Sequence, residues 1–390
     1  MRQLSRDVNM NRPVSFGKIK RACLVLHLFV GLVVGPVFVL MGLTGSALVF
    51  HRTLDEWFLP DRLPMESSRG IRSLDEVLTA ARMVLPHERK ATFFFMPRVP
   101  GGAYHVFSQV VDDATGAVHI IDVAVDPANA DVLSSRIWGR SLFSFIYEFH
   151  ESFLLDAAGD WFVGGAGIIL IGTVTTGLCL WWQSGAWRMS FTSDLNLHKS
   201  IGILSAAGLL IVALSGLYLA FPKGVRIVVD AFVPVHVSVR EPLIHLRSTR
   251  KADSRTLSLQ EAVEVADQRF PNAVLKVIQI PETPDGVFRV AKRQSGEPIH
   301  TFGYSQVWID QYSGKVLAER DWRMFGTGDV ILAWLFPLHN GEALGQGGRV
   351  VVFIVGLMPL VLYTTAFRSW WKKRRLRRDS GEGGNVTDAP

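Results

Sequence analysis

Two pairs of histidines occupy matching positions in the two halves of the chain, and their imidazoles could hold a metal cofactor. His27 and His198 each follow a leucine and precede a glycine by four residues, and His150 and His339 each lie 25 residues before a Thr-Thr pair. Zinc generally takes three or four protein ligands, whereas a haem iron takes one axial ligand on each face. The spacing therefore predicts two b-type haems, one held by His27 and His198 and one by His150 and His339.

The histidines belong to a repeat that covers most of the chain, and repeats of this kind set the architecture. The matched segments of the outer regions are Ser73–Pro86 with Ser258–Pro271, and Val123–Leu133 with Val307–Leu317. The first pair of segments predicts a short amphipathic helix that ends at proline. The second predicts strand, turn and strand, with Asp126 and Asp310 opening the turns. We therefore expect an internal tandem duplication, with a pseudo-twofold axis along the membrane normal.

The elements that position the inner histidines are long apolar stretches. The chain has 390 residues, of which 48% are hydrophobic. Four stretches lack charged residues apart from histidine, and each is near the roughly 20 residues that a membrane-spanning helix needs. They are Ala22–Phe50, Trp161–Trp182, Ser200–Phe221 and Val350–Phe367. The first is too long for a signal peptide and is expected to be retained.

The basic residues at the two ends of the chain predict its orientation. Lys18, Lys20 and Arg21 precede the first stretch, and six lysines and arginines follow the last one between residues 372 and 378. Positive charge next to a span favours the cytoplasmic side, so both termini are expected there. The net charge of +6 owes much to the C-terminal cluster, whose expected partners are lipid headgroups and not nucleic acid.

These features predict an integral membrane α-helical protein with four transmembrane helices and two α+β extracytoplasmic domains. The predicted segments are a cytoplasmic N-terminus at 1–21, a first span at 22–51, a first outer domain at 52–140, an interfacial segment and second span at 141–183, a cytoplasmic loop at 184–197, a third span at 198–221, a second outer domain at 222–330, an interfacial segment and fourth span at 331–371, and a basic tail at 372–390.

Two further groups of residues bear on the cofactor. The chain has two cysteines, Cys23 and Cys179, and no CxxCH sequence, so neither a disulfide framework in the outer regions nor covalent c-type haem is expected. His51 and Arg52 end the first span on the outer side. They are predicted to anchor the helix end at the interface, or alternatively to line the outer haem or an acceptor site.

Four segments carry a family resemblance that extends over nearly the whole chain. They are "LHLFVGLVVGPVFVLMGLTGSALVF", "LHKSIGILSAAGLLIVALSG", "VWIDQYSGKVL" and "LHNGEALGQGGR". With these segments the chain resembles the PepSY-associated transmembrane family. The resemblance implies PepSY-like outer domains, a bacterial inner-membrane location with those domains in the periplasm, and the same four histidines as axial ligands. The first domain departs from the pattern at Ala130, where the second has Gly314.

Some members of the family are similar to ferric-siderophore reductases of the ferrioxamine reductase type, which carry haem b. The resemblance thus implies a transmembrane electron-transfer protein that reduces a periplasmic Fe(III)-siderophore, so that iron is released. The chain has no nucleotide-binding GxGxxG after a predicted strand. The expected electron donor is therefore a separate cytoplasmic reductase or a membrane quinol.

Two other functions fit parts of the sequence. PepSY-type domains resemble binding or inhibitory modules, so the chain could be a membrane-anchored binding protein without redox activity. It could also be a haem-bearing membrane subunit that serves a periplasmic oxidoreductase. A binding module needs no ionisable residue inside membrane helices, where such residues are costly, and the matched histidines therefore favour the redox hypotheses.

Overall fold

The computed structural model describes most of the 390 residues as two compact units, one helical and one built around a sheet. The described residues are 16–57, 71–85, 91–98, 101–111, 118–155, 158–184, 188–237, 246–250 and 254–382. Parts of the predicted termini, Pro86 and the side chain of Arg52 lie outside them. The first unit comprises Met1–Leu43, Gly164–Leu214 and Ile354–Pro390, and the second comprises Thr44–Val163 and Ser215–Phe353.

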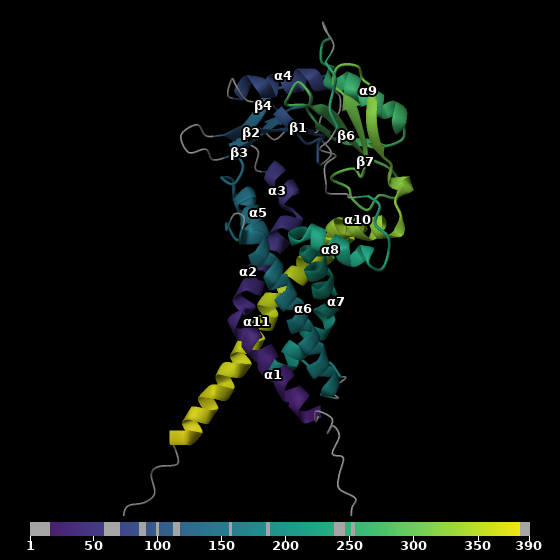
Figure 1. Ribbon diagram of the computed structural model, residues 1–390. Coiled ribbons are helices and arrows are strands. Elements are labelled where there is room, and N and C mark those ends of the chain that lie inside the picture. The colour runs from purple at the N-terminus through teal and green to yellow at the C-terminus, as the bar shows by residue number, and fades with distance from the viewer. Residues whose placement is uncertain are drawn as a thin grey trace, which may run out of the picture. The chain divides into compact units, whose positions relative to one another are not determined.

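The first unit consists of long apolar helices (Figure 1). Its helices are α1 (Phe16–Val33), part of α2 (Gly35–Val49), most of α6 (Gly159–Gln183), most of α7 (Asp194–Ala220) and most of α11 (Gly345–Glu382). Among the described residues, three helices are long and apolar enough to cross a membrane, within Gly159–Gln183, Asp194–Ala220 and Glu342–Arg378. The predicted first span forms a bent pair, which raises the number to four if the pair is one span.

The bend between α1 and α2 has a local cause in the sequence. The two helices meet at an angle of 58° on either side of Val34. Pro36 follows directly, and proline lacks the N–H that would continue the helical hydrogen bonds and clashes with the preceding turn. The backbone closes the break with a shorter bond, from the N–H of Val37 to the carbonyl of Val34 at 2.9 Å.

Glycines allow the helices of the first unit to approach closely. A Cβ atom at Gly42 of α2 would lie 2.2 Å from the carbonyl oxygen of Gly356 in α11. A Cβ at Gly208 of α7 would lie 2.6 Å from the side chain of Val355, also in α11. Membrane helices associate largely through such backbone contacts between small residues, so these glycines fix where the helices cross.

The second unit is built around one eight-stranded antiparallel sheet in the order β4-β3-β2-β1-β5-β6-β7-β8. The strands are β1 (Ala91–Phe95), β2 (Tyr104–Val111), β3 (Val118–Val125), β4 (Val132–Ile137), β5 (Val274–Gln279), β6 (Val287–Arg293), β7 (Ser305–Asp310) and β8 (Val316–Arg320). The two predicted outer domains each contribute four strands, and β1 pairs with β5 where Phe94 lies opposite Ile278. The strands of the two regions thus form one sheet and one core rather than two.

Two amphipathic helices cover the same face of this sheet (Figure 1). They are α4 (Leu74–Val84) and α9 (Leu259–Arg269), and each starts at a serine in a capping box, Ser73 or Ser258. Their buried sides pack on a single hydrophobic core with residues such as Phe94 and Ile278, both fully buried. The amphipathic helices predicted within Ser73–Pro86 and Ser258–Pro271 are therefore present.

Asp75 joins the two helices of this layer. Its carboxylate accepts a hydrogen bond at 2.9 Å from the backbone N–H of Leu259, at the start of α9. A negative charge at a helix N-terminus is favourable because the first N–H groups have no partner within the helix. This contact ties α4 of the first region to α9 of the second.

The remaining helices of the second unit are shorter. They are α3 (His51–Trp57), α5 (Leu142–Ser152), α8 (Pro222–Asp230), α10 (Thr327–His339), and the 3₁₀ turns η2 (Trp322–Met324) and η3 (Glu342–Leu344).

The predicted turns after β3 and β7 are also present. Asp126 accepts from the N–H of Ala128 at 2.7 Å, and Asp310 accepts from the N–H groups of Tyr312 and Ser313.

Candidate functional site

The structure brings His27 of α1 and His198 of α7 together within the first unit. Their ring centres lie 6.1 Å apart, and the ring planes are inclined by 78°. Both side chains are partly buried. The pair that the sequence repeat singled out is therefore a spatial pair.

Each of these histidines has the same kind of partner on a neighbouring helix. The Nδ1 atom of His27 lies 3.1 Å from the carbonyl oxygen of Thr173 and 3.2 Å from the hydroxyl of Thr176. The Nδ1 atom of His198 lies 3.0 Å from the carbonyl oxygen of Leu362 and 3.4 Å from the hydroxyl of Thr365. A carbonyl can only accept, so Nδ1 carries the proton in both rings and Nε2 is the nitrogen suited to bind a metal.

His150 of α5 and His339 of α10 form a second pair within the second unit. Their ring centres lie 6.2 Å apart with an inclination of 50°. The Nδ1 atom of His150 lies 3.0 Å from the hydroxyl of Thr44, and that of His339 lies 3.2 Å from the hydroxyl of Ser215. The two hydroxyls occupy matched positions in the first and third predicted spans.

Glycines next to these hydroxyls make room for the outer imidazoles. A Cβ at Gly45 would lie 2.9 Å from Cε1 of His150, and one at Gly216 would lie 3.0 Å from Cε1 of His339. In the inner pair, a Cβ at Gly177 would similarly lie 3.0 Å from Cε1 of His27. Gly45 and Gly216 occupy matching positions in the two halves of the chain, but a repeat gives no reason for a glycine. The structure supplies that reason.

The geometry of both pairs fits a metal held between two imidazoles. Bonds of about 2.0–2.1 Å from each nitrogen to a metal, with the ring centre about 1.1 Å beyond the nitrogen, place two ring centres roughly 6.2 Å apart. The observed separations are 6.1 and 6.2 Å. A hydrogen bond to the other ring nitrogen is the usual support of a metal-bound histidine. No group of three or more histidine, cysteine or acidic side chains placed to hold a metal occurs among the described residues.

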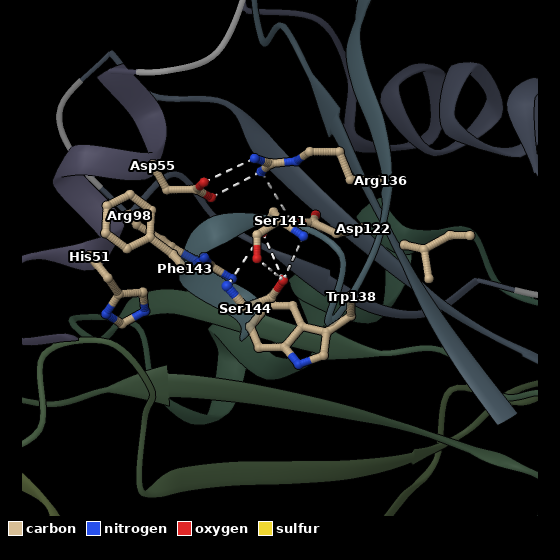
Figure 2. Close-up of a pocket in the computed structure, with 10 residues that line it drawn as sticks. His51, Asp55, Arg98, Asp122, Arg136, Trp138, Ser141, Phe143 and Ser144 are labelled. Atoms are coloured by element: carbon tan, nitrogen blue, oxygen red, sulfur yellow. Dashed lines mark hydrogen bonds and ion pairs between the residues drawn. The ribbon is translucent and has the colours of Figure 1, made fainter. Parts of the chain in front are cut away.

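His51, which the sequence suggested as a possible lining residue of the outer haem or an acceptor site, borders a small polar cavity in the second unit. His51 begins α3, and its Nδ1 atom donates a hydrogen bond to the carbonyl oxygen of Leu48. Its ring centre lies 6.5 Å from that of Tyr147. The other residues that line the cavity are Asp55, Arg98, Asp122, Arg136, Ile137, Trp138, Ser141, Phe143 and Ser144 (Figure 2). His51 therefore lies at the start of α3 and borders this cavity.

A buried charge network forms one wall of this cavity. Arg136 binds both oxygens of Asp55 at 2.9 Å and lies 3.6 Å from Asp122 (Figure 2). Asp122 is hydrogen-bonded to Nδ1 of His105 at 2.9 Å. Burial by itself raises the pKa of Asp122, but the contact with His105 and the charges of Arg98 and Arg136 hold it below its usual value.

The sequence analysis did not identify this network. His105, Asp122 and Arg136 lie on three different strands, and strand alternation places each of them on the face opposite α4 and α9. Alternation gives the face but not the register that sets which of these side chains meet.

Comparison with known proteins gives one finding. A family model described as the PepSY-associated TM region matches residues 24–373, and no curated protein matches the chain. The matched range includes all four paired histidines. The family match and the apolar helices together show that the chain is a membrane protein in contact with the lipid bilayer. The chain belongs to the PepSY-associated transmembrane family.

Proposed function

We propose that this chain is a di-haem b electron-transfer protein of the bacterial inner membrane that reduces a periplasmic Fe(III)-siderophore. One observation carries the proposal. Two pairs of histidines have ring centres 6.1 and 6.2 Å apart, and all four Nδ1 atoms are hydrogen-bonded to matched residues. A haem with two imidazole ligands accepts and releases one electron at a time while keeping both ligands.

The protein residues have distinct tasks in this proposal. His27 and His198 would hold one cofactor, and His150 and His339 the other. Thr176 and Thr365 orient the inner imidazoles together with the carbonyls of residues 173 and 362. The hydroxyls of Thr44 and Ser215 orient the outer ones, and glycines keep the adjoining helix surface small enough for the rings.

The proposal includes an orientation and an origin for the chain. We place both termini in the cytoplasm, the sheet unit in the periplasm and four spans in the membrane, because basic residues flank the first and last spans. We derive the two halves from a tandem duplication. The identical order of helix and four strands in each half, and the matched histidine partners, support it.

The substrates follow from this orientation. The donor is a cytoplasmic reductase or a membrane quinol, and the acceptor is ferric iron in a siderophore. Reduction releases the iron because hard oxygen ligands bind Fe(III) more tightly than Fe(II). A membrane-anchored binding module would give no reason for two matched histidine pairs, and a haem-bearing subunit of another oxidoreductase would share the cofactors but not the activity on ferric chelates.

The test is a reduced-minus-oxidised visible spectrum of the purified protein, with haem quantified per chain. We expect two b-type haems in the wild type and one in each of His27→Ala and His150→Ala. His119→Ala is the matched control, because this histidine has no equivalent in the other half, and it should retain both. Absence of haem from protein made with ample haem supply would refute the redox function. Two haems without reduction of ferric siderophore would favour the subunit alternative.

A further inference from the structure

The face of the sheet opposite α4 and α9 carries a row of three charged or ionisable residues in its first half. Asp122 of β3 lies opposite Arg136 of β4, and His105 of β2 reaches Asp122 from the other side. The carboxylate thus lies between a guanidinium at 3.6 Å and an imidazole at 2.9 Å. Asp122 is 5% exposed. In this row the carboxylate of Asp122 supplies the negative charge that balances the two basic side chains.

The second half of the sheet has the same row with a different middle residue. Gln306 of β7 lies opposite Arg320 of β8, in the register that Asp122 has with its arginine. Arg289 of β6 lies opposite Trp308, two residues along β7 from Gln306. Two arginines here flank a neutral amide, where the first half places a carboxylate between its two basic residues.

Two of the three residues of this second row are buried, Arg289 is partly buried, and the row carries no counter-charge among the residues that the structure describes. Arg320 is 9% exposed and Gln306 is 8% exposed. In the described part of the chain, the guanidinium group of neither Arg320 nor Arg289 forms an ion pair or hydrogen bond. Burial, and to a lesser extent the charge of Arg289, lowers the pKa of Arg320 to about 10. The Oε1 atom of Gln306 is also buried without a hydrogen-bond partner in this part of the chain.

Such an arrangement is costly unless an anion completes it. A buried charge normally requires a partner, and a buried acceptor without a donor also costs free energy. Arg320 gains some stabilisation from the ring of Trp308, since its guanidinium carbon lies 5.2 Å from the ring centre. A ring face does not neutralise two guanidinium groups, so an oxyanion is the natural complement.

We propose that Arg289, Gln306 and Arg320 form a binding site for a hydroxycarboxylate anion. Guanidinium groups bind carboxylates through paired N–H donors. The Oε1 atom of Gln306 can accept a hydrogen bond from the ligand's hydroxyl. Arg289 is more exposed than the other two residues, so we expect the ligand to enter beside it. The site requires no cofactor, so it is independent of the proposed haems.

The test measures thermal unfolding of the full-length protein in detergent free of phospholipid, with citrate as the probe. Citrate should raise the apparent Tm in a saturable manner, whereas sodium chloride at equal ionic strength should not. Inorganic phosphate should act at least tenfold more weakly than citrate. The absence of lipid ensures that a response reports a soluble anion and not a lipid phosphate.

Substitutions in the row locate the site. Gln306→Glu gives the second row the carboxylate of the first, and should raise the Tm without citrate and abolish the citrate response. Arg320→Gln should weaken the response at least tenfold. Arg247→Gln is the control, because this arginine is exposed and pairs with Asp285 away from the row, and it should leave the response unchanged.

Three outcomes would overturn the proposal. The first is a wild-type protein whose Tm does not respond to citrate. The second is a citrate response that survives in both Gln306→Glu and Arg320→Gln. The third is a response to phosphate as strong as that to citrate, which would show recognition of negative charge without the hydroxycarboxylate. Because haem content is measured separately, none of these results bears on the redox function.

Discussion

The hydroxyl of Thr44 lies 3.0 Å from the Nδ1 atom of His150 and fixes the orientation of that imidazole. Ser215 holds His339 in the same way at 3.2 Å. Both contacts are made by Nδ1, so Nε2 of each ring stays available to bind a metal. Partners of this kind determine how strongly a histidine binds its metal, and they lead to the first prediction.

Thr44→Val should weaken haem binding at the outer pair. Valine keeps the branched shape but removes the hydroxyl, and loss of such a partner typically lowers metal affinity about 10- to 100-fold. The measurement is the rate of haem transfer from the purified protein to apomyoglobin, which should show one of the two haems leaving faster. Thr79→Val is the control, because Thr79 bonds to its own helix at Asp75. Equal rates in both variants would contradict the assignment.

Gly45→Ala should disturb the same histidine by steric contact. The new Cβ would lie 2.9 Å from Cε1 of His150, and overpacking of this kind costs about 1–3 kcal/mol. We expect a lower content of the haem proposed at His150 and His339, and a lower Tm. Gly31→Ala is matched to it, since a Cβ there meets no atom within 4 Å, and should have no effect on either quantity. A normal spectrum of Gly45→Ala would show that the close approach is unimportant.

Ala130→Gly should stabilise the sheet unit. Ala130 has φ of +62° at the turn position where the other half has Gly314, with φ of +71°. A left-handed conformation costs a residue with a Cβ roughly 1–2 kcal/mol, and the greater freedom of glycine in the unfolded chain offsets part of the gain. We expect an increase in stability of about 0.5–1 kcal/mol, measured by chemical or thermal unfolding.

Gly314→Ala is the reciprocal of this substitution. The added Cβ would make ordinary contacts, the nearest at 3.7 Å to Leu257, so the backbone angle alone should make this variant less stable by about 1 kcal/mol. A stabilised Gly314→Ala protein would show that the φ values of the two turns do not govern their stability.

Asp122 should make stability depend on pH in the acid range. The pKa of its carboxyl is below the ordinary value of 3.8 in the folded protein. The carboxylate therefore contributes stability that is fully present above about pH 4 and is lost as the pH falls through the folded pKa. Asp122→Asn breaks a buried pair, which typically costs about 3–5 kcal/mol.

The measurement compares the Tm of the wild type and Asp122→Asn between pH 7 and pH 3. The difference should be largest at neutral pH and should shrink below about pH 4, where the Asp122 carboxyl of the unfolded wild-type protein becomes protonated before that of the folded protein. Glu76→Gln provides a comparison at an exposed carboxylate, whose loss should have a smaller effect. A difference between wild type and Asp122→Asn that is constant down to pH 3 would exclude the charge of Asp122 as the cause.

Much of the candidate site could be predicted because it is written as repeated spacing. The positions of His27 and His198 relative to their glycines, and of His150 and His339 relative to the Thr-Thr pairs, recur along the chain. Repeated spacing implies repeated local structure, and the structure places both pairs at about 6 Å. The hydroxyl partners of His27 and His198 could also be predicted, because Thr176 and Thr365 belong to those Thr-Thr pairs.

The sequence by itself also determined the local elements. Hydrophobic length predicted the apolar helices, and the repeated segments Ser73–Pro86 and Ser258–Pro271 predicted the amphipathic helices α4 and α9. Pro36 was visible in the first apolar stretch, but its effect on the helix was not anticipated. Such features depend on neighbours along the chain, and a single sequence contains that information.

Tertiary structure alone decided which distant strands pair. The contact of β1 with β5 merges eight strands into one sheet, and nothing in the alternation of either strand specifies its partner. The same holds for His105, Asp122 and Arg136, and for the row of Arg289, Gln306 and Arg320, since a shift of one residue in register would send each side chain to the other face. Local periodicity fixes what an element is, while the packing of the whole chain fixes which charges meet and which lack a partner.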